Sequence, residues 1–228
     1  VAGTARGTGS LSDVAEPAVD VRVRLDDLLL GEVAVRDIGG RLQGTPANLR
    51  ADATAQVAVP RLEPFEAEVS AYGPVTGPLT LGSIVADAAG GVQQAQGSAA
   101  WADGVQVSLG GYLRDIDLAA LHDELEGRAD ASLQFLYRDE RISLELGDLT
   151  GTLAGRPIGG AVALTQIEAG WRLEPGRLSV GANSLNGRGE LAGGRISVEA
   201  DLDAPELGAL GLGIDGDLAG RVELGGAW

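Results

Sequence analysis

The sequence predicts an all-β fold, and its repeated sets of strands favour an elongated sheet that grows by addition. Many short segments alternate apolar and polar side chains, as at residues 19–25 and 195–202, which is the pattern of strands with one apolar and one wet face. The 228 residues include 36 glycines, many of which bound these segments at expected tight turns. Only two short stretches have the signals of a helix.

The alternating segments predict the order of the strands. We expect strands at residues 19–25, 33–35, 49–59, 80–86, 93–101 and 105–109, followed by 129–137, 141–146, 149–153, 158–167, 171–173, 178–185, 187–191 and 195–202. Expected turns lie at Gly39-Gly40, 44–46, Asp103-Gly104, 137–141, Gly159-Gly160 and Gly193-Gly194. Residues 1–228 are therefore expected to form one elongated β segment of a larger protein, with a weak unit boundary at the proline-rich residues 60–78.

Two stretches, residues 117–127 and 203–211, each predict one or two turns of helix. Each begins with an Asp that can cap a helix and continues with leucines three or four apart. The Asp pairs that introduce them, at 115 and 117 and at 201 and 203, also suggest a metal site or an acid–base pair. We favour caps formed by Asp117 and Asp203, because one explanation then covers both copies. The two copies indicate a long, degenerate repeat.

Composition excludes several classes of function. A formal net charge of -16 opposes a nucleic-acid partner, since phosphate binding needs clustered basic side chains. His122 is the only histidine and there is no cysteine, so no nucleophile and base set can be assembled, and an enzyme is the least favoured class. We predict no catalytic residue, no metal ligand and no cofactor. No apolar run approaches the ~20 residues of a membrane span.

The apolar strand faces carry the remaining functional signal. They can pack against a second sheet, giving a sandwich core ~10 Å thick that binds a soluble ligand or none. Alternatively, the sheet curls without closing, and its apolar face lines a trough where each buried methylene contributes ~0.8 kcal/mol. Periodicity alone does not choose between these two arrangements.

Three pieces of the sequence resemble the TamB family of the translocation and assembly module, within the AsmA-like superfamily. They are Leu-Asp-Ala-Pro-Glu-Leu-Gly-Ala-Leu at 202–210 with 214–220, the shorter copy at 116–121 with 125–127, and Leu-Ser-Val-Gly-Ala-Asn-Ser-Leu-Asn-Gly-Arg-Gly-Glu-Leu at 178–191. The resemblance implies an open, curled, antiparallel β-sheet, shaped like a half-pipe with a hydrophobic inner face. It also implies a periplasmic location, in a protein anchored in the inner membrane by a segment outside this chain.

The resemblance further implies a function in outer-membrane biogenesis. The expected ligand is phospholipid, carried by its acyl chains between the inner and outer membranes, and the expected protein partner is an outer-membrane β-barrel contacted by regions outside this segment. The rival function is a structural β module that assists barrel assembly by strand addition. The residues expected to line the groove are Val21, Val23, Val105, Val107, Leu109, Ile142, Leu144, Leu146, Ile196 and Val198.

Overall fold

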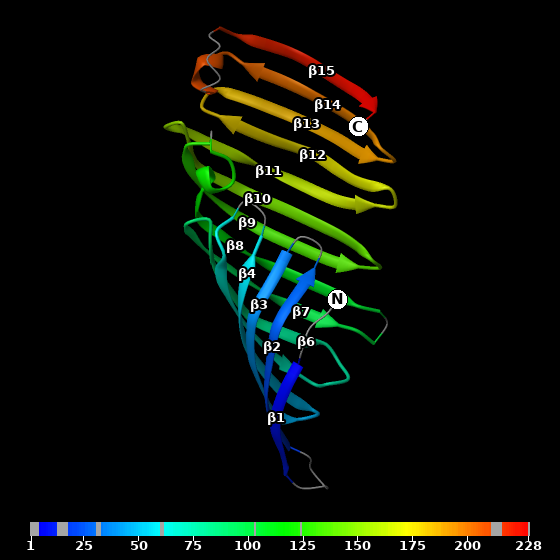
Figure 1. Ribbon diagram of the computed structural model, residues 1–228. Helices are drawn as coiled ribbons and strands as arrows, with labels where there is room; N and C mark the ends of the chain where they lie inside the picture. Colours follow the sequence, from blue (N-terminus) through cyan, green and yellow to red (C-terminus); the bar gives the residue numbers. More distant parts are fainter. Residues whose placement is uncertain are drawn as a thin grey trace. The chain divides into compact units, whose positions relative to one another are not determined.

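The strands of the computed structural model hydrogen-bond in the order of the sequence, from β1 to β15, in one sheet (Figure 1). All of the pairings recorded between neighbouring strands are antiparallel, because short connections return the chain alongside the strand it has just left. No pairing between β1 and β15 occurs among the described residues, so the sheet is open. The predicted all-β fold with an open antiparallel sheet is confirmed, and the single sheet replaces the alternative of a two-sheet sandwich.

The structure describes residues 5–12, 18–30, 33–59, 62–102, 104–123, 125–210 and 216–227. The chain divides into two units, Val1–Gly111 and Tyr112–Trp228. The strand β8, Gln106–Asp117, contributes residues to both. Residues 62–78, the described part of the proline-rich stretch, lie within the first unit, where β5 pairs with both of its neighbours.

The elements have the following bounds. In the first unit and into β8 they are β1 Ala5–Ser12, β2 Ala18–Leu30, β3 Val33–Thr45, β4 Asn48–Ala58, β5 Phe65–Gly73, β6 Leu79–Ala88, β7 Gly91–Ala100 and β8 Gln106–Asp117. In the second unit they are the 3₁₀ turn η1 Leu118–Ala120, β9 Gly127–Arg138, β10 Arg141–Leu153, β11 Arg156–Ile167, β12 Gly170–Val180, β13 Asn183–Ala192, β14 Arg195–Ala204, the 3₁₀ turn η2 Leu207–Leu210 and β15 Leu218–Ala227.

Curling is visible within the first unit, where β2 and β3 pass in front of β6 and β7 (Figure 1). Bulges contribute to it, since an extra residue on one strand bends that strand and increases its twist. The pairing shifts register between β3 and β4, between β5 and β6, and between β6 and β7. In the second unit the same happens on both sides of β10 and on both sides of β12.

Three strands contain an aspartate with positive φ, and in β3 and β10 this aspartate lies at a bulge. Asp37 in β3, Asp115 in β8 and Asp148 in β10 all have positive φ, between 48° and 56°, a conformation that Asp tolerates better than most residues. Two of them are held from β9: Arg128 Nη1 donates to Asp115 Oδ2 over 2.6 Å, and Ser132 Oγ donates to Asp148 Oδ2 over 3.1 Å. The third lies 4.0 Å from an arginine of β2. Each of the three aspartates therefore has a polar contact with a neighbouring strand.

The bulge at Asp148 joins two predicted strands into one. The sequence predicts separate strands at 141–146 and 149–153, but β10 runs from Arg141 to Leu153 and the register shifts only between Leu146 and Leu149. One extra residue in the strand leaves the hydrogen bonding intact on either side. The prediction of two strands was therefore wrong.

Two glycine pairs that were predicted as turns lie inside strands. Gly39-Gly40 belongs to β3 and Gly159-Gly160 to β11. At Gly160, with φ 148°, an added Cβ atom would stand 2.0 Å from the carbonyl oxygen of Arg177 on β12, so only glycine fits there. The turn that the sequence missed is at Gly181, with φ 57°, which splits the predicted strand 178–185 between β12 and β13.

The first helical turn forms as predicted. Asp117 is the N-cap of η1, and its Oδ1 accepts a hydrogen bond of 3.0 Å from the backbone N–H of Ala119. The second turn also forms, but its predicted cap was wrong. Asp203 lies inside β14, paired with Ser184 and Ala219, and η2 begins only at Leu207.

Asn183 holds the connection that leads into η2. Its Nδ2 donates to the carbonyl oxygen of Glu206 over 2.9 Å, and its Oδ1 accepts from the N–H of Glu206 over 3.0 Å. The residue is 3% exposed, and Ala204 beside this connection is fully buried. The chain therefore folds back onto the start of β13 before η2 begins.

Replacing Asn183 by alanine is expected to lower the free energy of unfolding by about 2 kcal/mol, because two backbone groups of Glu206 lose their partner at a buried position. Amide hydrogen exchange at residues 205–207 should accelerate as well. Asn186→Ala, at an exposed position of the same strand, is the control and should change neither quantity. Equal effects of the two substitutions in chemical denaturation would contradict the anchoring role.

Candidate functional site

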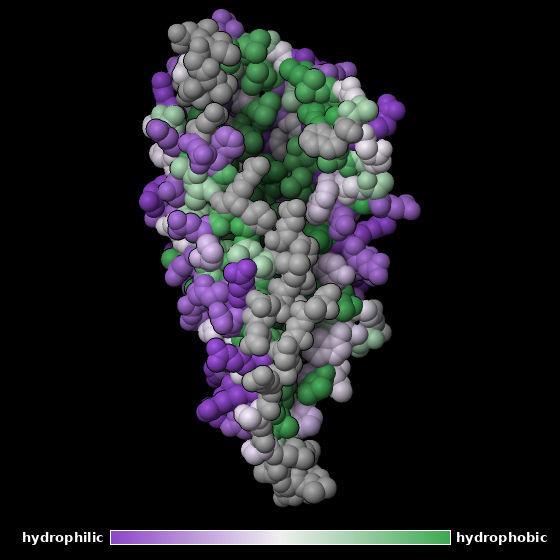
Figure 2. Space-filling model, viewed as in Figure 1, coloured by the Kyte–Doolittle hydropathy of each residue, from purple (hydrophilic) through white to green (hydrophobic). Residues whose placement is uncertain are grey.

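Strand register brings apolar side chains together on one side of the second unit. Residues paired across antiparallel strands share a face, so one row runs from Phe135 through Leu144, Leu164, Leu173, Gly189 and Val198 to Leu224. We call the side of the sheet that carries this row the apolar face of the second unit. Figure 2 shows hydrophobic residues gathered in a hollow between hydrophilic margins over these strands.

No charged side chain belongs to this face among the described residues. Its members are Ala129, Ala131, Leu133, Phe135 and Tyr137 of β9; Ile142, Leu144, Leu146, Leu149, Gly151 and Leu153 of β10; Ile158, Gly160, Val162, Leu164 and Gln166 of β11; Trp171, Leu173, Gly176, Leu178 and Val180 of β12; Asn183, Leu185, Gly187, Gly189 and Leu191 of β13; Ile196, Val198, Ala200, Leu202 and Ala204 of β14; and Leu218, Gly220, Val222, Leu224 and Gly226 of β15.

Large hydrophobic side chains of this face remain in contact with solvent. Leu185 is 39% exposed and Leu191 37%, and Leu224 reaches 60% on the last strand. None of the large side chains in the described part of the chain is fully buried, because the sheet has a single layer there. An exposed apolar surface that extends over seven strands is of the kind that marks an interaction site.

The first unit has an equivalent face, built from smaller side chains. One row runs through Val23, Gly40, Ala53, Val69, Ile84 and Ala95, and the next through Val21, Leu42, Ala51, Ala71, Leu81 and Gly97. Alanine and glycine occupy half of these positions.

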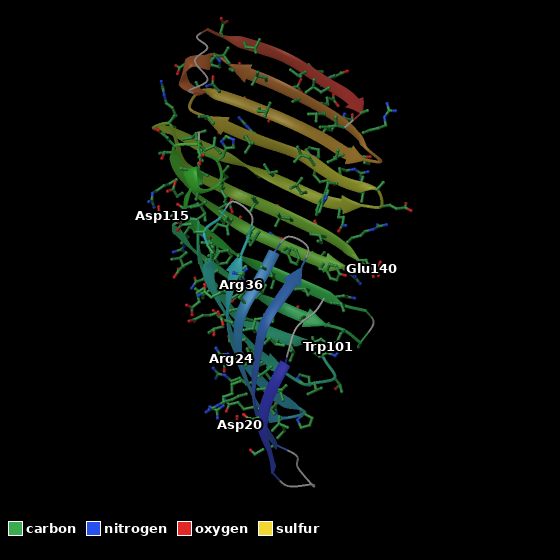
Figure 3. The ribbon with its side chains drawn as sticks, viewed as in Figure 1. Asp20, Arg24, Arg36, Trp101, Asp115 and Glu140 are labelled. Carbon is green, nitrogen blue, oxygen red and sulfur yellow. The ribbon has the colours of Figure 1, made fainter. Side chains whose placement is uncertain are left out.

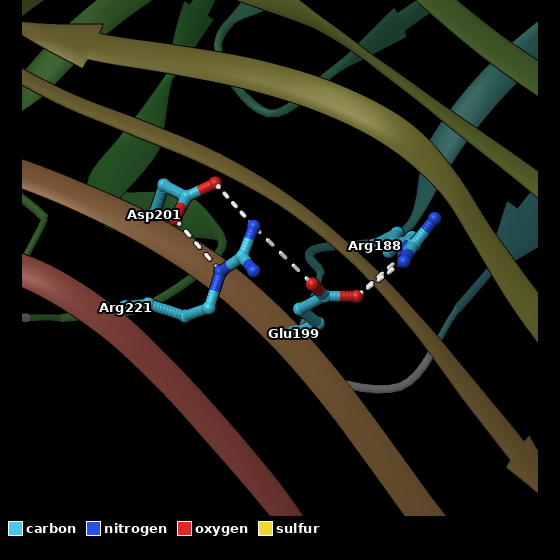
Figure 4. A network of polar contacts seen from close by, with 4 residues as sticks. All are labelled: Arg188, Glu199, Asp201 and Arg221. Carbon is cyan, nitrogen blue, oxygen red and sulfur yellow. Dashed lines mark hydrogen bonds and ion pairs between the residues drawn. The ribbon is translucent and has the colours of Figure 1, made fainter.

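The opposite side of the sheet carries the charges. On the second unit Glu199 Oε2 accepts from Arg188 Nε over 2.8 Å, while its Oε1 lies 3.4 Å from Arg221, which also contacts Asp201 (Figure 4). The bond to Asp201 raises the pKa of Arg221, which stays charged. These side chains alternate along β13, β14 and β15 with those of the apolar face, so the charged side chains described in these strands lie on one face only.

The first unit repeats this arrangement. Arg41 Nη2 donates to Asp20 Oδ2 over 2.6 Å, and this hydrogen bond holds the pKa of the Asp20 carboxyl below its ordinary value. Asp20 and Arg24 of β2 project outward from the sheet, as does Asp115 of β8 (Figure 3). Exposed pairs of this kind add little to stability, so their effect is mainly to keep this side hydrated.

Two hollows on the polar side are distinct from the apolar face. One of ~460 Å³ in the first unit is lined by residues 39–41, 52–54 and 68–70 and by Ser83. One of ~340 Å³ in the second unit is lined by residues 112–114, 130–132 and Asp148. Within the described part of the chain, no group of three or more His, Cys, Asp or Glu side chains is arranged to hold a metal ion. Asp117 caps η1, Asp115 accepts from Arg128, and Asp201 and Asp203 lie on the polar side of β14.

The structure places nine of the ten predicted lining residues on strands. Val21 and Val23 lie in the two rows of the first unit, and Val107 and Leu109 alternate with exposed residues along β8. Ile142, Leu144, Leu146, Ile196 and Val198 belong to the apolar face of the second unit. Val105 precedes β8 and is 58% exposed, so the prediction that it starts a strand was wrong.

Other members of the apolar face were missed because bulges conceal the alternation. In β12 the residues that face the same way are Leu173 and Leu178, five apart, since the bulge between Leu173 and Gly176 adds a residue. Phe135 and Leu164 lie on regular stretches, so bulges do not account for their omission. Their pairing with Leu144 places them on the apolar face, and strand pairing is not visible in the sequence.

The family model for the TamB N-terminal domain matches residues 27–228. The chain belongs to the TamB family. No curated protein and no solved structure matches it. TamB proteins are transport and assembly components that span the periplasm from an anchor in the inner membrane, and the chain accordingly has a TamB-like role in outer-membrane assembly. In the described part of this TamB domain, helices are too short to cross a bilayer.

The two faces of β14 provide a test of the TamB apolar face with neighbouring residues. Val198→Asp puts a charge between Gly189 and Leu224 and should lower the fluorescence of a bound apolar dye, N-phenyl-1-naphthylamine, several-fold. The substitution should also cost about 1–3 kcal/mol, because a half-buried charge lacks a partner. Ser197→Asp, on the polar side of the same strand, should leave the dye signal unchanged. Equal dye binding by both folded variants would show that the dye does not use this face.

Proposed function

We propose that the apolar face of this TamB domain carries the acyl chains of phospholipids between the inner and outer membranes. The observation that supports the proposal is a face of seven strands with exposed leucines and no charge among the described residues. Acyl chains need no directional contacts, and such a surface offers none over most of its area. The periplasmic location of the family provides the aqueous gap that a lipid must cross.

The dimensions of the face suit a diacyl lipid. Seven strands spaced ~4.8 Å apart extend ~29 Å across the sheet. One leaflet of a bilayer is about half of the ~30 Å hydrocarbon core, so an extended acyl chain needs ~15 Å. Each methylene removed from water contributes ~0.8 kcal/mol, so ten of them contribute ~8 kcal/mol before the entropic cost of binding.

The polar side supports the same proposal. Charged residues and exposed ion pairs keep it hydrated, so a lipid gains nothing by moving from the apolar face to the opposite side. The assembly role of the family further supports an outer-membrane β-barrel as the protein partner, contacted by regions outside residues 1–228.

A pair of substitutions on β10 tests the lipid proposal. Leu144 lies between Phe135 and Leu164 on the apolar face, and the neighbouring Ser143 belongs to the polar side. Leu144→Asp should reduce the phospholipid that copurifies with the chain several-fold, as measured by native mass spectrometry, because a carboxylate among methylenes is costly. Ser143→Asp should retain the wild-type amount.

Circular dichroism decides whether the comparison is valid, since both variants must keep their strands. If folded Leu144→Asp protein retains as much phospholipid as the wild type, lipid carriage by this face is refuted. The remaining function would then be the structural one, in which the sheet assists barrel assembly by strand addition.

A further inference from the structure

Hydrogen-bonding side chains on the apolar face of the second unit are few and lie in two places. Asn183 is bound to the backbone of Glu206. The others are Tyr137, Gln166 and Trp171, of β9, β11 and β12. Gln166 pairs with Trp171, and Tyr137 pairs with Ile142 at the start of β10, so all three lie next to the tight turns 139–140 and 168–169. We call them the polar row.

The polar row is free to bind a ligand. None of its three side chains has a hydrogen-bond partner among the described residues, and none of its polar atoms is a buried, unsatisfied one. Trp171 is 39% exposed. An indole N–H only donates, whereas a phenol and an amide both donate and accept. A group that satisfies the whole row must therefore offer hydrogen-bond acceptors, such as the oxygens of an ester or a phosphate.

The opposite rim of the second unit is covered at two places, by the connections with η1 and η2, and we call it the closed rim. Strands alternate in direction, so β8 and β14 end at the same rim, and the connections with η1 and η2 both lie there. Ala129 and Ala131, at the start of β9 that η1 contacts, are 6% and 7% exposed, and Asn183 and Ala204 are 3% and 0% exposed beside η2. These four are the residues of the described second unit that are most deeply buried.

The closed rim also carries negative charge. Its connections include Asp117, Asp123, Glu126 and Glu206, and Arg156 Nη1 lies 3.4 Å from Glu206. The other rim carries carboxylates as well, at Asp139, Glu140 and Glu168, so charge does not by itself distinguish the two rims. The polar row lies at the other rim, next to the tight turns 139–140 and 168–169.

We propose that an amphiphile binds across the second unit in one orientation, with the ester and phosphate oxygens of its headgroup on the polar row and its acyl chains directed along the strands toward the rim closed by η1 and η2. This inference rests on the proposed lipid function. Eight residues separate Gln166 from Ile158 along β11, or ~26 Å at ~3.3 Å per residue, which exceeds the ~15 Å of an acyl chain.

The chemistry of the row fits the boundary between a headgroup and its chains. Trp and Tyr have an apolar ring and a polar tip, so they are stable where hydrocarbon meets water. Gln166 lies between them in the row and adds two donors and an acceptor. Lipid then enters and leaves across the rim that carries the polar row, because its headgroup does not have to pass the connections with η1 and η2.

Photocrosslinking determines the orientation directly. The whole chain is incubated with phosphatidylethanolamine vesicles that contain a phosphatidylethanolamine probe, with a diazirine either on the headgroup nitrogen or at the end of an acyl chain. The headgroup probe should label residues 137–142 and 166–172, and the chain-end probe residues 178–185 and 202–204. Reversed labelling, or the same labelling by both probes, overturns the orientation. Absence of labelling on the apolar face by either probe overturns the proposed function itself.

A variant of the polar row tests the hydrogen bonds. Combining Tyr137→Phe, Gln166→Leu and Trp171→Phe should weaken phospholipid binding about tenfold, because hydrogen bonds to the headgroup contribute modestly each, while binding of N-phenyl-1-naphthylamine is kept. The control combines Ser143→Ala, Thr165→Val and Ser197→Ala on the polar side and should bind both as the wild type does. Unchanged phospholipid binding by the polar-row variant contradicts the proposal. If that variant loses dye and lipid binding together, the substitutions have disturbed the face as a whole. The orientation is then accepted or rejected from the crosslinking pattern of the unmodified chain.

Discussion

Backbone hydrogen bonds between neighbouring strands hold this sheet together, and their register decides which side chains share a face. A slip by one residue would exchange the two sides of a strand. The bulges preserve this agreement. In β10, Leu146 and Leu149 are three apart and would face opposite ways in a regular strand, but the extra residue at Gly147-Asp148 returns both to the apolar face. The Asp bulges are therefore part of how the face stays free of charge.

A single-layered sheet cannot hide its apolar side, and this determines the energetics of the molecule. Hydrophobic burial comes from neighbouring side chains in the rows, from curling in the first unit and from the two helical turns that cover one rim of the second. Much apolar surface stays in contact with water. A ligand that covers this surface is therefore stabilised by the hydrophobic effect. The ion pairs of the opposite side add little to stability and keep that side in solvent.

The helical turns give the second unit two unlike rims. Both connections follow strands that run in the same direction, so they meet at the same rim, and there they cover alanines and a bound asparagine. The other rim has no helical turn among the described residues of the second unit, and it carries the only unpartnered hydrogen-bonding side chains of the described apolar face. Because the two rims differ, the apolar face of the second unit has a polar row at one rim and helical turns at the other. This arrangement suits a ligand with a polar headgroup and apolar chains.

The sequence by itself determined the strand-rich fold, the alternation that separates polar from apolar sides, the capped turn at Asp117 and the resemblance to TamB. These depend on neighbours two to four residues apart, which a sequence displays. Only the tertiary structure decided that Gly160 lies in a strand, that Asn183 and not Asp203 holds the second turn, and that Tyr137, Gln166 and Trp171 share a row. The physical reason is that these features depend on the partner strand, whose register is set by bulges that no short-range pattern reveals.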